Sequence, residues 1–96
     1  MSDFDFFPYA VHYVRTTKNI ETDNETKLKY YALYKVATIG SCQEHGGSRP
    51  WALNIEGKAK WDAWNNLGDM SPETAKLEYV KLLSLQYPSW LDTFKN

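Results

Sequence analysis

Apolar residues recur every three or four positions along most of this chain, and proline, glycine or helix-capping residues interrupt the pattern between segments. This spacing places apolar side chains on one face of an α-helix. No alternation of apolar and polar residues runs long enough to predict a strand. The pattern therefore predicts an all-α fold built from four helices.

The first predicted helix runs from about Asp5 to Thr16 or Thr17. If Asp5 is its N-cap, Pro8 occupies the third helical position, where its missing N–H has no intrahelical partner to lose. The second helix follows a capping box, Thr22–Glu25, and ends at Gly40. We expect its main stripe to contain Leu28, Tyr31, Ala32, Lys35 and Ile39.

The remaining two helices lie in the second half of the chain. One is predicted over Ile55–Leu67 after an Asn54 cap, and the other opens at Ser71-Pro72 and stops at Pro88. The segment Ser41–Pro50 contains two adjacent glycines and no periodicity, which predicts a flexible loop.

The length of 96 residues leaves room for one hydrophobic core, so we expect a single domain over residues 1–96. Cys42 is the only cysteine, which excludes an internal disulfide and favours a reducing compartment; we expect a cytoplasmic protein. The apolar stretch near the start, interrupted by Pro8 and His12, has neither the flanks of a signal peptide nor the length of a membrane span.

Net charge is −1, which provides no general attraction to nucleic acid or to a membrane. The charges are unevenly distributed, however. Residues 27–60 hold six basic and two acidic residues, a local +4, and the rest of the chain holds five basic and ten acidic residues, or −5. A basic stretch of this kind is either a solvated helix face or an anion-binding surface.

Tyr31 and Lys35 stand four residues apart on the second predicted helix, with Tyr34 on the flank between them. A ring beside a cation suits a nucleotide, which offers a base to stack and a phosphate to neutralise. The alternative is a tyrosine-rich edge of the core covered by lysine stems. Lys60 beside Trp61 in the third helix offers a second candidate, again with core packing as the alternative.

Other chemistry lacks the residues it needs. Cys42 and His45 have the spacing of half a zinc site, but His12 is the only other histidine, so we expect no metal. There is no G-x-S-x-G, P-loop or G-x-G-x-x-G motif. We therefore expect neither an enzyme nor a bound cofactor.

Two long motifs, YALYKVATIG at 31–40 and GKAKWDAWN at 57–65, occur together with Arg49-Pro50, Ser71 and Tyr79. In combination they resemble the acyl-CoA-binding protein family, and the resemblance covers nearly the whole chain. It implies an up-down-down-up four-helix bundle that binds long-chain acyl-CoA without catalysis.

The resemblance also implies a ligand site. The residues at the positions that hold the 3′-phosphorylated adenosine of CoA are Tyr31, Lys35, Lys60 and Tyr79, and those on the same face are Ala32, Leu33 and Tyr34. The acyl chain would lie in an apolar groove near Leu28 and Trp61. His12 and Glu56 stand where many members of the family have basic residues that contact the ligand, and Lys27 replaces a usual apolar residue of the acyl groove.

We therefore expect a cytoplasmic monomer that sequesters long-chain acyl-CoA and carries it to lipid-metabolising enzymes through transient contacts. Acyl-CoA is then a carried ligand and not a cofactor, and neither a nucleic-acid partner nor a stable membrane anchor is expected. His12 and Glu56 keep one alternative open, a helical protein-interaction module that retains the fold with weak or no acyl-CoA binding. An acyl-CoA hydrolase is a third, poorer hypothesis.

Overall fold

Helices form all the regular structure in residues 6–17, 23–51 and 53–94, which are the residues that the computed structural model describes. In chain order these elements are α1 (Phe7–Thr16), α2 (Asn24–Thr38), α3 (Cys42–His45), α4 (Ile55–Asn65), α5 (Pro72–Gln86) and a final 3-10 turn, η2 (Trp90–Phe94). The all-α prediction is confirmed.

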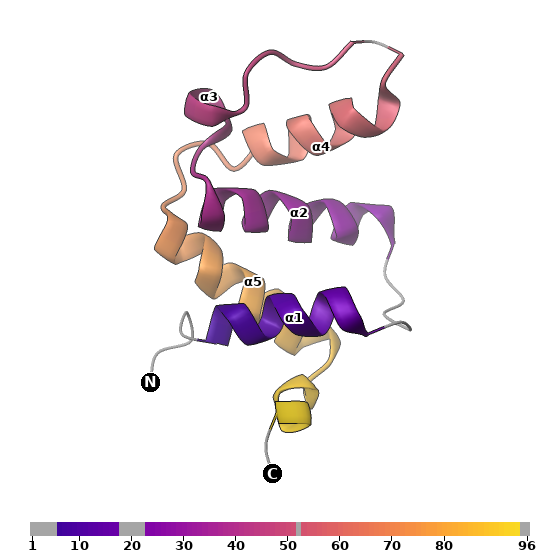
Figure 1. Cartoon of the computed structure of the whole chain (residues 1–96), viewed down its shortest axis with the longest axis vertical. Coiled ribbons are helices and arrows are strands. Elements are labelled where there is room, and N and C mark those ends of the chain that lie inside the picture. Colours follow the sequence, from indigo (N-terminus) through magenta and orange to yellow (C-terminus); the bar gives the residue numbers. More distant parts are fainter. Residues whose placement is uncertain (1–5, 18–22, 52, 95–96) are drawn as a thin grey trace.

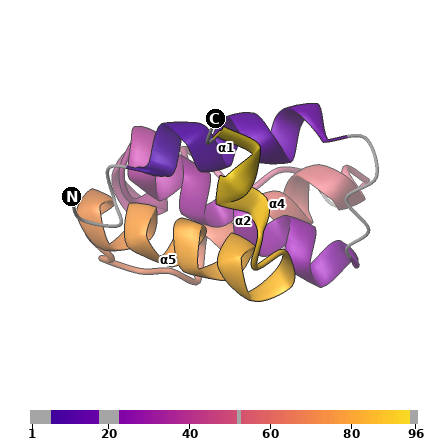
Figure 2. The same ribbon diagram turned by 90° about the horizontal axis from the view of Figure 1, so that it is seen from below.

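The four longer helices have the up-down-down-up arrangement, since α1 and α5 run in one sense and α2 and α4 in the other (Figure 1). Helix α2 lies in the middle and packs against α4 on one side and α5 on the other. Seen from below, α1 and α5 lie on opposite sides of the view with η2 between them (Figure 2). The parallel pair α2 and α4 requires the long connection that contains α3.

Polar side chains cap three of these helices at their N-termini. Asp23 accepts a hydrogen bond from the Thr26 N–H at 2.8 Å, Asn54 does so from Gly57, and Ser71 from Thr74. The caps at Asn54 and Ser71 are as predicted. The second helix is capped by Asp23 and not by Thr22, because the carboxylate at Asp23 reaches the third N–H of the helix; Thr22 itself lies outside the described residues.

Helix α1 begins later than predicted. Its N-cap is Phe6, which makes no side-chain capping bond, so the predicted N-cap at Asp5 is wrong; Asp5 lies outside the described residues. Because the helix starts at Phe7, Pro8 occupies the second helical position, where its missing N–H again costs no bond.

The core collects apolar and aromatic side chains from the four longer helices, from α3 and from η2. Its members are Phe7, Ala10, Tyr30, Ala32, Leu33, Val36, Ala37, Cys42, Trp64, Ala75, Tyr79, Val80, Leu83 and Trp90. The stripe predicted for α2 is partly wrong, since Ile39 is 45% exposed while Tyr30, Val36 and Ala37 are buried. A helix covered on two sides buries a wider arc than a single stripe.

Two elements were not predicted. Ser41 caps the one-turn helix α3 by accepting a hydrogen bond from the Glu44 N–H, so part of the expected flexible loop is helical. Past Pro88, η2 folds back and buries Trp90, whose indole N–H donates to the Ser84 hydroxyl at 2.9 Å.

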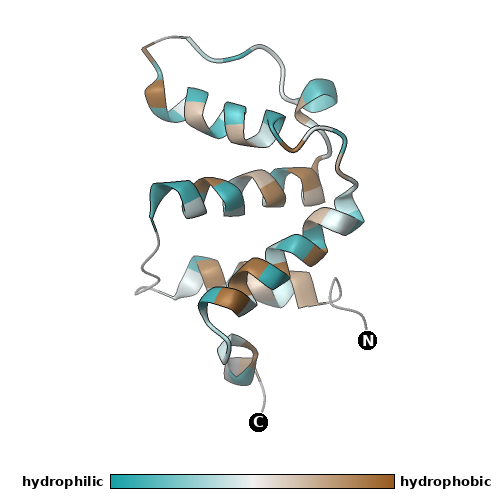
Figure 3. Ribbon diagram, turned by 180° about the vertical axis from the view of Figure 1, so that it is seen from behind, coloured by the Kyte–Doolittle hydropathy of each residue, from teal (hydrophilic) through white to brown (hydrophobic). Residues whose placement is uncertain are grey.

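Seen from behind, apolar and polar residues alternate along α5 (Figure 3). None of the described helices has the length and apolarity needed to span a membrane.

Candidate ligand-binding site

Tyr31 lies beside two ammonium groups that come from different helices. The Lys35 Nζ, one turn further along α2, lies 5.8 Å from the centroid of the Tyr31 ring, and the Lys60 Nζ of α4 lies 5.6 Å from it. All three side chains are half-buried. The parallel packing of α2 and α4 thus brings together three of the predicted site residues, and we call this group the lysine cluster.

The Lys35 side chain packs over Trp64, a core residue that is 5% exposed. The Lys35 Nζ lies 4.9 Å from the centroid of its indole ring, within cation–π range. The Trp64 indole N–H donates to the Gly40 carbonyl at 2.8 Å, which fixes the orientation of the ring. Gly40 has a φ of 118°, a conformation that suits glycine where the chain leaves α2.

One carboxylate faces the lysine cluster. The Glu56 Oε1 lies 3.0 Å from the Lys60 Nζ, one helical turn away on α4. Both groups are reached by solvent, and Glu56 is the more exposed partner. A ligand phosphate that approaches Lys60 therefore competes with a carboxylate already in place.

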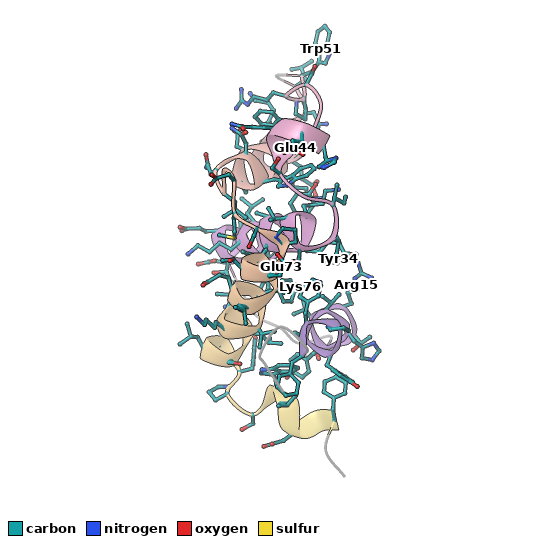
Figure 4. All side chains as sticks on the ribbon, turned by 90° about the vertical axis from the view of Figure 1, so that its left-hand side faces the viewer. Arg15, Tyr34, Glu44, Trp51, Glu73 and Lys76 are labelled. Carbon is teal, nitrogen blue, oxygen red and sulfur yellow. The ribbon has the colours of Figure 1, made fainter. Side chains whose placement is uncertain are left out.

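A second cation approaches the neighbouring tyrosine from α1. The Arg15 guanidinium donates a hydrogen bond to the Tyr34 hydroxyl at 2.8 Å and lies 5.0 Å from the centroid of that ring. Figure 4 shows the two side chains together on one side of the molecule. Tyr34 follows Tyr31 by three residues on α2, so Arg15 extends the row of cations along the same helix face.

Tyr79 is a core residue in this structure. It is 3% exposed, and its ring centroid lies 5.2 Å from that of Phe7 and 5.1 Å from that of Tyr30. Burial raises the pKa of the Tyr79 hydroxyl well above its ordinary value, and the positive charge of Arg15 acts in the opposite direction. Burial likewise raises the pKa of Tyr30 to about 12. Both hydroxyls remain neutral donors at physiological pH.

A groove of about 760 Å³ runs between α2, α4 and α5. Its apolar walls include Leu28, Ala59, Ala63, Leu67, Met70 and Leu82. The predicted residues Ala32 and Leu33 also border it but are almost fully buried. Leu28 lines the groove one turn before Tyr31 on α2, and Ala59 lines it one residue before Lys60 on α4, whereas Tyr31, Lys35 and Lys60 themselves lie outside its lining.

Two predicted contacts lie elsewhere. Trp61 is turned toward α3, where its indole N–H donates to the Gly46 carbonyl at 3.3 Å, and it is not part of the groove wall. His12 is exposed and stands 6.0 Å, between ring centroids, from Phe94 of η2. Arg15, one turn later on α1, is the basic residue of this helix that contacts Tyr34.

Arg49 binds the connection that precedes α4 to the helix itself. Its guanidinium donates to both carboxylate oxygens of Asp62, at 2.8 and 2.7 Å. These bonds hold the pKa of Asp62 below its ordinary value. Among the described residues, no group of three or more His, Cys, Asp or Glu could hold a metal ion.

Comparisons with known proteins agree on one family. A sequence model described as acyl CoA binding protein matches residues 5–83. The solution structure of an acyl CoA binding protein from Babesia bovis T2Bo has 44% identity, a TM-score of 0.80, and coverage of 93% of this chain and 98% of that one. The crystal structure of Oryza sativa acyl-CoA-binding protein 2 gives 28% identity and a TM-score of 0.72, over 98% and 94% of the two chains.

Longer proteins also contain a matching segment. Acyl-CoA-binding domain-containing protein 1 of Arabidopsis thaliana is 42% identical over 72 residues, which are 75% of this chain and 20% of that protein. Enoyl-CoA delta isomerase 2 of Homo sapiens is 43% identical over 83 residues, 86% of this chain and 20% of that protein. The chain spans about a fifth of the length of these curated relatives.

Proposed function

We propose a function for this chain on one premise: it belongs to the acyl-CoA-binding protein family. Family and fold support acyl-CoA binding in general, by proteins that bind without catalysis. The more specific proposal is that residues 1–96 form one domain that sequesters long-chain acyl-CoA and carries it between enzymes. We further propose that it acts as a cytoplasmic monomer with transient partners.

The observation that carries this proposal is the lysine cluster. Two ammonium groups from separate helices lie beside one tyrosine ring, which suits a phosphate next to a base. Lys35 and Lys60 would neutralise the 3′-phosphate of CoA, and Tyr31 would pack on the adenine. Arg15 adds a third cation at Tyr34, within the reach of a second phosphate. Tyr79 supports this face from the core.

We place the acyl chain in the groove between α2, α4 and α5. The groove is lined mainly by apolar side chains, and its lining residue Leu28 lies one helical turn before Tyr31 of the lysine cluster on α2. An amphipathic ligand can thus bind with its anionic head at the cluster and its tail in the groove. This arrangement retains Leu28 as an acyl contact and gives Trp61 a structural role at α3.

Calorimetric titration with acyl-CoAs of graded length, free CoA and free fatty acid tests the proposal. Each two-carbon extension inside the groove should raise affinity roughly tenfold, at about 0.8 kcal/mol per buried CH₂. Free CoA and free fatty acid should each bind far more weakly than the thioester. Equal affinity for CoA and long-chain acyl-CoA would contradict the groove assignment.

One alternative has a specific observation in its favour. Glu56 already pairs with Lys60, so a carboxylate stands at the cationic site where many family members have a basic residue. A helical interaction module that retains the fold without the ligand would show no heat of binding with any acyl-CoA.

A further inference from the structure

Three large apolar side chains project into solvent at one end of the molecule. Trp51 is 86% exposed, Leu53 94% and Ile55 78%. They lie on the turn that leads into α4, where the Asn54 N–H donates to the Trp51 carbonyl at 2.9 Å. Figure 4 shows Trp51 at the extreme end of the long axis, pointing away from the helices. We call these three residues the apolar tip.

The other three tryptophans show how unusual this exposure is. Trp64 and Trp90 are buried, Trp61 is half-buried, and each indole N–H donates to an oxygen of the chain. Leaving a tryptophan, a leucine and an isoleucine together in water forgoes the free energy that burial of each provides. Exposed apolar clusters of this kind mark surfaces that meet a partner.

The charge around the apolar tip indicates the nature of that partner. Residues 24–65, which comprise α2, its connection with the tip, and α4, carry six basic and four acidic residues, a net charge of +2. The rest of the chain carries five basic and eight acidic residues, a net charge of −3. In Figure 1, α2, α4 and their connection occupy one half of the molecule and α1, α5 and η2 the other. The half that bears the tip therefore has a modest positive charge, with Arg49 paired to Asp62 and Lys60 paired to Glu56 within it, and the other half is negative.

We propose that the apolar tip docks this protein onto an anionic lipid surface, with Trp51, Leu53 and Ile55 entering the headgroup region. Tryptophan, with an apolar ring and a polar N–H, favours that depth of a bilayer. A stable protein interface needs a broad complementary patch of about 800 Å² on each partner, whereas a protruding turn presents only a few side chains. The proposal goes beyond acyl-CoA binding and does not depend on it.

Vesicle binding by the ligand-free protein tests the proposal. We would compare sedimentation with vesicles of phosphatidylcholine containing 30% phosphatidylserine against vesicles of phosphatidylcholine alone. The parent should bind the anionic vesicles more tightly, and added salt should weaken that binding. Lipids brominated on the acyl chain near the headgroup should quench the emission of Trp51.

The decisive variant is the double substitution Trp51→Ser, Leu53→Ser. It should weaken vesicle binding by about a hundredfold, roughly tenfold for each side chain withdrawn from the interface. Ile39→Ser, which also removes an exposed apolar side chain but far from the tip, is the matched control and should bind as the parent does. Far-UV circular dichroism should be identical for all three proteins.

Three results would overturn the proposal: no binding of the parent to anionic vesicles, unchanged binding by the double variant, or a parent dimer that the double variant converts to monomer. The last result would make the tip an interface between two copies of the chain. Acyl-CoA affinity measured in solution without vesicles should be the same for parent and double variant. That measurement separates a failure of this inference from a failure of the proposed function.

Discussion

Lys35 and Lys60 contact the same tyrosine ring from two helices, so each should contribute to holding one phosphate. We expect Lys35→Ala or Lys60→Ala to weaken acyl-CoA binding by about 1.5–3 kcal/mol, the range for a hydrogen bond to a charged group. Calorimetry on folded variants checks this. Wild-type protein offered acyl-3′-dephospho-CoA should show the same loss, and the variants should then lose little more. Losses that add in full would place the 3′-phosphate elsewhere.

Glu56 should limit the affinity that Lys60 can provide. Because its carboxylate lies 3.0 Å from the Lys60 ammonium, a ligand phosphate must displace it and also meets its negative charge. Glu56→Gln should raise acyl-CoA affinity by about two- to fivefold at low ionic strength, consistent with the modest energy of an exposed pair. Glu73→Gln, an exposed acid at the start of α5, is the matched control. Unchanged affinity in Glu56→Gln would remove Glu56 from the site.

Arg15 should contribute to phosphate binding through the side of the site nearest Tyr34. Arg15→Gln removes a charge that already donates to the Tyr34 hydroxyl, so affinity for acyl-CoA should fall several-fold at low salt. His12→Gln, one turn earlier on α1 and beside Phe94, should bind as the parent does. A larger loss in His12→Gln than in Arg15→Gln would instead support His12 as the ligand contact, as the sequence predicts.

Arg15 and Trp64 were not predicted as site residues, and they show which contacts cannot be predicted from the sequence. Tyr31 and Lys35 are neighbours on one helix, so their spacing alone predicts that they meet. Arg15 reaches Tyr34 from α1, a helix that packs mainly on α5, and Trp64 of α4 supports Lys35 of α2. No local pattern encodes such contacts. His12 and Arg15 differ by three positions on α1, and only the packed structure shows which one faces the tyrosines.

Two helix caps of the same type should respond differently to acid. Asp23 caps α2 and Ser71 caps α5, each accepting a hydrogen bond from the N–H three residues on. Bonds from Thr26 hold the pKa of Asp23 below its ordinary value of 3.8. A carboxyl group whose pKa is lower in the folded than in the unfolded chain stabilises the folded state at pH values above its pKa in the unfolded chain. This contribution is lost as the pH falls through its pKa in the folded chain.

We therefore expect Asp23→Ala to lower the free energy of unfolding at pH 7 and to differ progressively less from the parent below about pH 3.8. Ser71→Ala should cost about 1 kcal/mol, and its deficit should not vanish in acid because a hydroxyl does not titrate there. Urea unfolding at several pH values measures both. A deficit in Asp23→Ala that persists at pH 2 would show that the carboxylate charge is not what caps α2.

Capping residues and prolines mark element boundaries in the sequence, but not every one was predicted correctly: the N-cap of α1 is Phe6 and not Asp5, and that of α2 is Asp23 and not Thr22. Asn54, Ser71 and the break before Pro88 were read correctly, since each acts on the backbone beside it. Helix α3 was not predicted because a single turn is too short to show a helical repeat of apolar residues, although Ser41 is an ordinary N-cap residue. The turn η2 depends on burial of Trp90 against the bundle, which is a tertiary effect.

At the scale of the whole molecule, the lysine cluster should bind the CoA head of the ligand and the groove should bind its acyl chain. A substitution in the groove should therefore affect only the acyl chain. Ala63→Phe fills part of the groove wall, so affinity should no longer rise with acyl-chain length, while affinity for free CoA stays as in the parent. Titration with acyl-CoAs of graded length measures this, and the retained CoA binding verifies the fold. Ala63→Ser, which leaves the volume open, is the control. If chain-length dependence survives in Ala63→Phe, the tail lies outside this groove.

Helix α2 is covered by α4 on one side and α5 on the other. Backbone amides at its buried centre, such as those of Leu33, Val36 and Ala37, can meet water only when the whole bundle opens, so their hydrogen exchange should proceed at the rate set by global unfolding. A ligand that binds only the folded chain slows that exchange by the factor 1 + [L]/Kd. Deuterium uptake at three amides of one helix thus becomes a measure of affinity that needs neither a label on the ligand nor a heat of binding.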